Sequence, residues 1–255
     1  MYDTILFDLD GTIINSEEGI VNSAMYTLSK FGITNENASS LRRFIGPHLH
    51  KSFSMFRGFS EEKAALAVDI YREYYAEKGI FECFVYDGMQ ELFRKLKRDG
   101  KTLIVATSKY ELFAKKIIDR LGFSQYFDLV IGSNKDGSRS EKSEIIRDAL
   151  AIANISDLSS AVMVGDRMHD IIGASKVGIS SVGVLYGFGT LFELTESGAS
   201  RITKNADEIY RIITEQNKKH APGACFFVLS YKTRHNGLLA FGKTVFLFSK
   251  SNALY

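Results

Sequence analysis

The chain has few cysteines, no long apolar run and little net charge, and each shortage excludes a class of protein. Two cysteines, Cys83 and Cys225, are too few for a disulfide framework. No apolar run approaches the roughly 18 residues that a membrane-spanning helix needs. The net charge of +2 argues against nucleic acid or an anionic membrane as a partner. No basic segment precedes an apolar run at the N-terminus, so we expect no signal peptide and a cytoplasmic location.

The composition is that of an ordinary globular protein, with 45% apolar and 24% charged residues in a chain of 255. Its length is sufficient for a sizeable core. Charge is spread unevenly, because residues 218–255 hold six lysines and arginines and no acidic residue. This leaves 26 basic and 30 acidic residues in 1–217. We therefore treat 218–255 as a separate segment, in which 224–231 and 238–248 have the pattern of two strands.

Short apolar runs that alternate with helical patterns predict the core fold. Strand-like runs occur at 4–7, 103–106, 129–131, 161–164 and 181–185, and helical spacing lies between them. This order predicts an α/β fold with a Rossmann-like parallel sheet and helices on both faces. Residues 15–87 lack such strands and contain helical spacing, notably at 60–78. We predict a core of 1–14 and 88–217 with a helical insertion at 15–87.

Polar side chains follow three of the predicted strands. In a parallel sheet, ligands bind beyond the carboxyl ends of the strands. Carboxylates gathered there repel one another unless a cation lies among them, and oxygen ligands without a Cys or His cluster favour Mg²⁺ over zinc. The residues concerned are Asp8, Asp10, Thr107, Ser108, Asp166 and Asp170.

The loop after the first strand has the residues that phosphoryl transfer needs. Of Asp8 and Asp10, one side chain can attack phosphorus while the other handles a proton. The peptide N–H groups of Leu9, Asp10 and Gly11 can form a nest for phosphate oxygens. The alternative interpretation is a plain Asp-Gly turn.

At these positions the chain resembles a known family. Asp8–Thr12, Thr107, Lys142 and Gly165–Asp170 follow the order of the four motifs of the haloacid dehalogenase-like superfamily. The insertion at 15–87 resembles the helical cap of its phosphoglycolate phosphatase and β-phosphoglucomutase branch. The resemblance covers about 1–217, so 218–255 stays an atypical basic and apolar tail of unknown role.

The resemblance implies a role for each matching residue. Asp8 is expected to be the nucleophile that forms an aspartyl-phosphate, and Asp10 the acid and base. Thr107, Ser108 and Lys142 are expected to hold the phosphoryl group. Mg²⁺ is expected to be bound by the Asp8 carboxylate, the Asp10 carbonyl and Asp166, with support from Asp170.

Two of these assignments have alternatives in the sequence. Ser143 follows Lys142 where many relatives have proline, so Lys142 can also be read as a surface lysine, with Lys109 as the other candidate cation. Asp170 can be read as an exposed residue that suits the dipole of a helix N-terminus.

A basic stretch in the insertion predicts a contact with the substrate. Residues 38–60 contain no acidic residue but several basic ones, and Gly46-Pro47 breaks the stretch into a loop. We predict that Arg43, or else Arg42, reads a second anionic group on the substrate. The alternative is an ordinary solvated helix face.

Together these features predict a Mg²⁺-dependent phosphatase acting on a small phosphorylated metabolite, phosphoglycolate-like or a nucleotide. One alternative is a phosphomutase of the β-phosphoglucomutase type, which passes the phosphoryl group to a sugar hydroxyl. Another is a non-catalytic binding or regulatory protein on the same fold. The sequence does not determine the oligomeric state, and it predicts no nucleic-acid or membrane partner.

Overall fold

The computed structural model describes residues 1–47, 49–136, 138–215, 224–235 and 238–249. A mostly parallel sheet runs through it in the order β10-β9-β8-β7-β6-β1-β4-β5, with only β9 and β10 antiparallel to each other. The strands are β1 (Thr4–Phe7), β4 (Thr102–Tyr110), β5 (Leu129–Ser133), β6 (Ala161–Gly165), β7 (Ser180–Val184), β8 (Arg201–Thr203), β9 (Ala224–His235) and β10 (Leu238–Ser249). The predicted α/β class is confirmed, and the short strand β8 is an element that the sequence pattern did not reveal.

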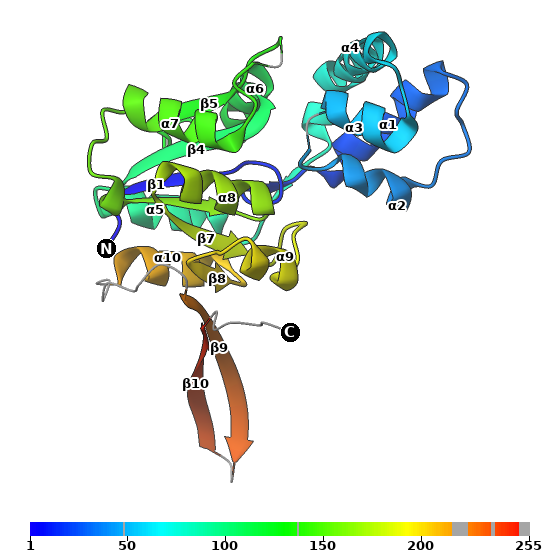
Figure 1. The fold of residues 1–255 in the computed structure, drawn as a ribbon. Helices are drawn as coiled ribbons and strands as arrows, with labels where there is room; N and C mark the ends of the chain where they lie inside the picture. The colour runs from blue at the N-terminus through cyan, green and yellow to red at the C-terminus, as the bar shows by residue number, and fades with distance from the viewer. Residues whose placement is uncertain (48, 137, 216–223, 236–237, 250–255) are drawn as a thin grey trace.

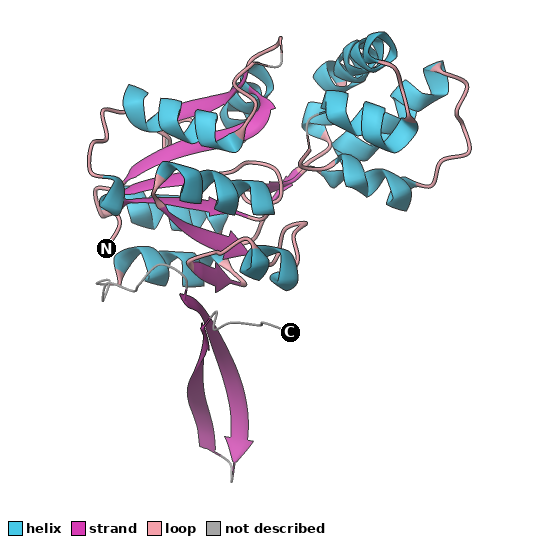
Figure 2. Cartoon of the chain, viewed as in Figure 1, coloured by secondary structure: helices cyan, strands magenta, loops and turns pink. Residues whose placement is uncertain are grey.

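Helices cover both faces of the part of the sheet formed by β8-β7-β6-β1-β4-β5 (Figure 2), in which the buried residues of the strands are largely apolar. In β1, Ile5 and Phe7 pack on one face against α5, α6 and α10, whereas Leu6 packs on the other against α7 and α8. Because neighbouring residues of a strand point to opposite faces, the side chains of β1 belong to two apolar clusters, one on each face of the sheet. The helices are α5 (Met89–Arg98), α6 (Glu111–Arg120), α7 (Lys142–Ile152), α8 (Met168–Val177), α9 (Leu191–Glu196) and α10 (Ala206–Thr214), with the 3₁₀ turn η3 (Leu158–Ser160).

The segment after β1 forms a separate group of helices beside the sheet (Figure 1). It enters and leaves through β2 (Ile14–Asn15) and β3 (Phe84–Val85), which pair antiparallel. Its apolar interior is continuous with the core cluster that contains Ile5 and Phe7 of β1. Its elements are α1 (Glu17–Lys30), α2 (Ala38–Leu41), η1 (Arg42–Phe44), α3 (Leu49–Arg57), α4 (Glu61–Glu77) and η2 (Gly79–Phe81). No helix in the described part of the chain is both long enough and apolar enough to span a membrane.

The C-terminal segment contains the two strands that its pattern predicts, each longer than expected. β9 and β10 pair along their whole length and project beyond the rest of the sheet (Figure 1). β9 meets β8 at only two residue pairs, Arg201 with Phe226 and Ile202 with Phe227. The expected turn includes residues 236–237, which lie outside the described residues. The hairpin thus has little backbone pairing with the core.

We expect truncation after Asn217 to leave the core folded, because few backbone contacts join the hairpin to it. The loss in free energy of unfolding should stay below about 2 kcal/mol, which corresponds to roughly 4–8 °C in melting temperature for a domain of this size. Circular dichroism and thermal melting of the truncated and full chains measure this. An insoluble product, or one without cooperative melting, would show that the hairpin is part of the core.

Candidate active site

Three carboxylates lie together at the carboxyl edge of the sheet. Asp8 follows β1 and Asp166 follows β6, and these strands are neighbours with Phe7 opposite Val164. Asp170 joins them from the first turn of α8. Oxygen atoms of the three side chains lie within 4.8 Å of one another, and all three residues are buried. The sheet therefore brings together residues that are more than 150 positions apart in the chain.

This cluster is short of positive charge. Burial raises the pKa of Asp8 to about 6, with Lys142 opposing the rise and Asp170 adding to it. Burial, followed by the charges of Asp170 and Asp8, raises the pKa of Asp166 well above its usual value. Asp166 Oδ2 accepts the Phe188 N–H at 2.7 Å, but its buried Oδ1 has no hydrogen-bond partner among the described residues. Such an all-oxygen cluster with an unpaired buried atom fits a hard divalent cation such as Mg²⁺.

Lys142 is buried against the nucleophile candidate. Its Nζ lies 2.7 Å from Asp8 Oδ1 and 2.8 Å from Asp170 Oδ1, and it donates to the Ala106 carbonyl at 3.0 Å. Burial lowers the pKa of the ammonium, but Asp170 and Asp8 outweigh that effect and raise it. The alternative of a solvated surface lysine is therefore excluded, and the exposed position considered for Asp170 is excluded by the same contacts.

Lys109 pairs with the other carboxylate of the loop. Its Nζ lies 2.8 Å from Asp10 Oδ1 and 2.7 Å from Oδ2. The Lys109 side chain is 8% exposed and that of Asp10 14%. The two lysines that the sequence left as rivals for one role thus contact different carboxylates.

The peptide N–H groups of Leu9, Asp10 and Gly11 differ in whether they already donate a hydrogen bond within the chain. Among the described residues, the N–H groups of Leu9 and Asp10 donate to no backbone carbonyl, and Asp10 lines the cavity described below. Gly11 departs from the expectation, since its N–H donates to the Ile14 carbonyl at 2.7 Å. Its φ of +81° and a Cβ position only 2.2 Å from Asp166 Oδ2 explain why glycine is needed there. Gly11 makes room for the carboxylate cluster and is not a phosphate donor in this structure.

Thr107 and Ser108 lie beside the carboxylates, although β4 continues past them to Tyr110 with an irregular register. Thr107 is buried and its Oγ1 accepts the Lys109 N–H at 3.3 Å. Ser108 is partly exposed. Both line the cavity described next, as their place near the strand end predicted.

A cavity of about 490 Å³ opens between the sheet edge and the helical group. On the core side it is lined by Asp8, Asp10, Thr107, Ser108, Lys142 and Asp170. On the other side its wall is partly aromatic and partly basic, with Phe44, Lys51, Tyr71, Arg72 and Tyr75. Two members of the carboxylate cluster, Asp8 and Asp170, therefore line a cavity that a small organic ligand can enter.

Arg43 does not face this cavity, so the expected contact between Arg43 and the substrate has to be corrected. Its Nε donates to the Ser40 carbonyl at 2.6 Å, and its guanidinium lies 5.4 Å from the ring centre of Phe56. Arg42, the alternative, pairs with Glu17 instead. Both residues belong to η1, a single 3₁₀ turn whose orientation the charge pattern of the stretch does not reveal.

Two arginines that sequence reasoning missed line the cavity. Arg72 of α4 donates from Nη2 to the Lys135 carbonyl at 2.9 Å, across from the helical group to the core. Arg167 donates from Nη1 to the Ile45 carbonyl at 2.9 Å in the opposite direction. Arg167 lies within the Gly165–Asp170 motif, and this position could have identified it as a residue of the site. No sequence pattern marks Arg72 in this way, because it follows Tyr71 on an ordinary amphipathic helix.

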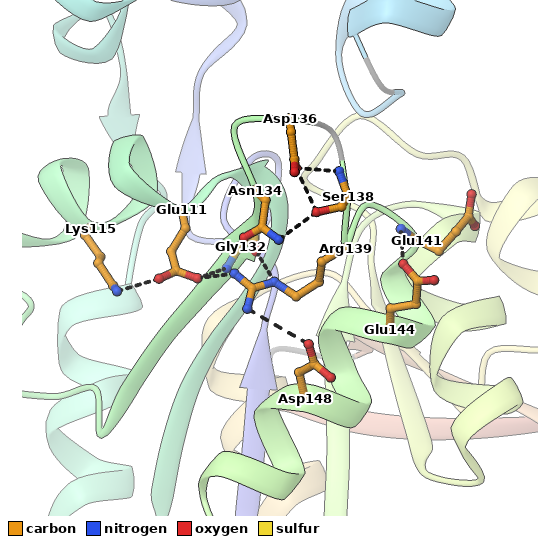
Figure 3. A network of polar contacts seen from close by, with 10 residues as sticks. All are labelled: Glu111, Lys115, Gly132, Asn134, Asp136, Ser138, Arg139, Glu141, Glu144 and Asp148. Atoms are coloured by element: carbon orange, nitrogen blue, oxygen red, sulfur yellow. Dashed lines mark hydrogen bonds and ion pairs between the residues drawn. The ribbon is translucent and has the colours of Figure 1, made fainter.

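A polar network holds the loop between β5 and α7, which borders the cavity (Figure 3). Arg139 has a left-handed backbone, with φ of +51°, and donates from Nε to the Gly132 carbonyl at 2.8 Å. Its guanidinium also pairs with Glu111 at the start of α6. The network ties the loop to the core, and α7 begins with Lys142 directly after it.

The chain is similar to several known proteins. Residues 5–184 match the family model described as haloacid dehalogenase-like hydrolase. The chain is 42% identical over 193 residues to a 5'-nucleotidase of Pseudomonas aeruginosa, a match that covers 76% of this chain and 87% of that protein. The crystal structure of a predicted phosphatase from Clostridium acetobutylicum is 46% identical, with a TM-score of 0.80 over 84% of this chain and 98% of that one. A haloacid dehalogenase-like hydrolase from Streptococcus pneumoniae is 30% identical, with a TM-score of 0.77 over 84% and 99%.

We expect Mg²⁺ to stabilise the protein through the carboxylate cluster. An ion present at 100 times its dissociation constant adds about 2.7 kcal/mol, or roughly 5–10 °C in melting temperature. Asp166→Asn should remove most of this increase. It should also raise the melting temperature of the metal-free protein, because one of three repelling carboxylates is gone.

Thermal melting with Mg²⁺ and with EDTA measures both effects. Asp119→Asn is the matched control, because it neutralises an exposed carboxylate on α6 and should leave the increase unchanged. An undiminished Mg²⁺ effect in Asp166→Asn would place the ion elsewhere.

Proposed function

Because the chain belongs to the haloacid dehalogenase-like hydrolase family and is a phosphatase of that family, we propose that it is a Mg²⁺-dependent hydrolase of a small phosphomonoester that works through an aspartyl-phosphate. One observation carries this proposal. Asp8 lies buried between Lys142 and two further carboxylates, beneath a cavity large enough for a metabolite. Relatives named 5'-nucleotidase, probable phosphatase and predicted phosphatase favour water as the acceptor, whereas a relative from Mycobacterium tuberculosis that is 35% identical is named tyrosine-protein kinase PtkA.

The first half of the reaction transfers the phosphoryl group to Asp8. A carboxylate oxygen of Asp8 attacks phosphorus, and the bond between phosphorus and the leaving oxygen breaks. Asp10 gives a proton to that oxygen, so the product leaves as a neutral alcohol. We assign the binding of the phosphoryl oxygens to the peptide N–H groups of Leu9 and Asp10 and to the hydroxyls of Thr107 and Ser108, because Asp10, Thr107 and Ser108 line the cavity.

The second half returns the enzyme to its starting state. Water attacks phosphorus and gives its proton to the Asp10 carboxylate, while the bond from phosphorus to Asp8 breaks. Inorganic phosphate leaves and Asp8 is again a carboxylate. Lys142 neutralises part of the charge around Asp8 in both halves. Asp8, the Asp10 carbonyl, Asp166 and Asp170 would hold Mg²⁺, which supplies positive charge against the phosphoryl oxygens.

The cavity favours a nucleoside monophosphate over the smaller candidate substrates. Its volume of about 490 Å³ exceeds what phosphoglycolate needs, and aromatic side chains including Phe44, Tyr71 and Phe113 line it. Aromatic rings stack on nucleobases without regard to sequence. The relative named 5'-nucleotidase supports the same substrate class.

We also propose that residues 15–87 act as a cap over a core formed by 1–14 and 88–217. The chain passes between the two parts through β2 and β3, and Arg72 and Arg167 form hydrogen bonds between the parts at the cavity. A cap of this kind limits the access of bulk water to the site and selects the leaving group.

Phosphate release from a panel of phosphometabolites with Mg²⁺ tests the substrate class. We expect nucleoside monophosphates to be hydrolysed with a higher kcat/KM than phosphoglycolate and sugar phosphates. Arg72→Ala should raise KM for the preferred nucleotide roughly tenfold or more, since a charge-assisted hydrogen bond contributes about 1.5–3 kcal/mol. The same variant should change KM for p-nitrophenyl phosphate little.

Arg43→Ala is the control for this comparison, because Arg43 lies outside the cavity. It should change neither KM. Faster hydrolysis of phosphoglycolate, or sugar-phosphate isomerisation without phosphate release, would reject a nucleotide phosphatase.

Substitutions at the two loop carboxylates separate their roles. Asp8→Asn should abolish the phosphoenzyme with every substrate, because the nucleophile is lost. Asp10→Asn should slow turnover about 10²–10⁴-fold, because proton transfer is lost. With p-nitrophenyl phosphate, whose leaving group needs no proton, it should accumulate a phosphoenzyme. Rapid quench and intact-protein mass spectrometry detect this species, and finding the phosphoryl group on any residue other than Asp8 would overturn the assignment.

A further inference from the structure

Lys109 and Lys142 each contact one of the two loop carboxylates. Lys142 Nζ lies 2.7 Å from Asp8, whereas Lys109 Nζ lies within 2.8 Å of both carboxylate oxygens of Asp10. The proposed function accounts for the position of Lys142, which would neutralise charge on Asp8 and on the phosphoryl group that Asp8 receives. Lys109 contacts neither Asp8 nor Asp170, so its charge serves Asp10.

The helical group completes the surroundings of Lys109. The Lys109 ammonium lies 4.7 Å from the ring centre of Tyr75, a residue of α4. Tyr71 stacks on Tyr75 at 5.6 Å with the rings 13° apart, and Phe113 of α6 packs against it at 5.4 Å. The Tyr75 hydroxyl has no hydrogen-bond partner among the described residues, so Tyr75 meets Lys109 through its ring face. An ammonium over an aromatic face is attracted by the ring's quadrupole, whose negative part lies over the face.

Asp10 keeps the capacity to accept a proton while it is held in this way. A carboxylate has about four acceptor sites, and the ammonium uses one on each oxygen. The remaining sites are free to accept from a water in the cavity, which Asp10 lines. A carboxylate fixed on both oxygens cannot rotate away from that water.

We propose that Lys109 is the positioning residue of Asp10, and that it holds the carboxylate, with Tyr75 of the cap behind it, in the orientation that accepts the proton of the attacking water. This inference rests on the proposed function. It concerns the second half of the reaction, in which water gives its proton to Asp10 and the bond from phosphorus to Asp8 breaks. Misplacement of such a group by about 1 Å costs as much as 10²-fold in rate.

Burst kinetics with p-nitrophenyl phosphate test the proposal. In Lys109→Met, the first turnover should release about one p-nitrophenolate per enzyme at nearly the wild-type rate, because that step needs no proton. Steady-state turnover should then be roughly 10- to 100-fold slower than in the wild type. The phosphoenzyme should accumulate on Asp8 during this phase. Lys109→Arg should restore much of the steady-state rate, since a guanidinium binds both oxygens of a carboxylate.

Two further variants keep the test decisive. Lys101→Met is the matched control, because it also removes a buried lysine, paired with Asp3 at 2.8 Å at the amino ends of β4 and β1. It should show no burst. Tyr75→Leu removes the ring face and should reproduce the Lys109→Met pattern in a weaker form, which tests the proposal even if Lys109→Met does not fold.

The outcomes separate this inference from the function on which it rests. A burst in Asp10→Asn, but a uniform loss without a burst in Lys109→Met and Tyr75→Leu, would overturn the role of Lys109 alone. Absence of a phosphoenzyme on Asp8 in every variant would overturn the aspartyl-phosphate mechanism, and the role of Lys109 with it.

Discussion

The concentration of negative charge at one sheet edge is the constraint on which the rest of this structure depends. Asp8, Asp166 and Asp170 are buried together, where water cannot screen their repulsion. Burial and this repulsion raise the pKa of Asp8 and of Asp166. Lys142 offsets part of the charge by contact with two of the three carboxylates. Burying three carboxylates together destabilises the fold, and groups with such perturbed pKa values are typical of functional sites. A divalent cation would offset the remaining negative charge.

The helical group completes a site that the sheet begins. The sheet edge supplies the acidic cluster, and α4 supplies Tyr71, Arg72 and Tyr75 to the opposite wall of the cavity. Hydrogen bonds cross the opening in both directions, from Arg72 to the core and from Arg167 to the loop before α3. In the function that we propose, the residues for chemistry and those for selection of the leaving group lie on different parts of the chain. Such a separation allows one fold to act on different substrates.

Sequence reasoning succeeded where backbone geometry alone decides the outcome. Residues directly after neighbouring parallel strands must meet, which is why Asp8 and Asp166 could be placed together without coordinates. It failed at Arg43, because a 3₁₀ turn between two short helices gives no periodicity from which to infer a face. It also failed at Gly11, because the N–H of that residue has a local acceptor in Ile14.

The sequence by itself determined the alternating α/β core, the helical insertion, the acidic residues at the strand ends and the order of the family motifs. These features depend on local periodicity and on the rule that parallel strands share one carboxyl edge. Only the tertiary structure decided that Lys142 contacts Asp8 while Lys109 contacts Asp10, and that Arg72 instead of Arg43 lines the cavity. A long flexible side chain reaches several ångströms in any direction from its backbone, so its partner is set by the packing of distant segments around it.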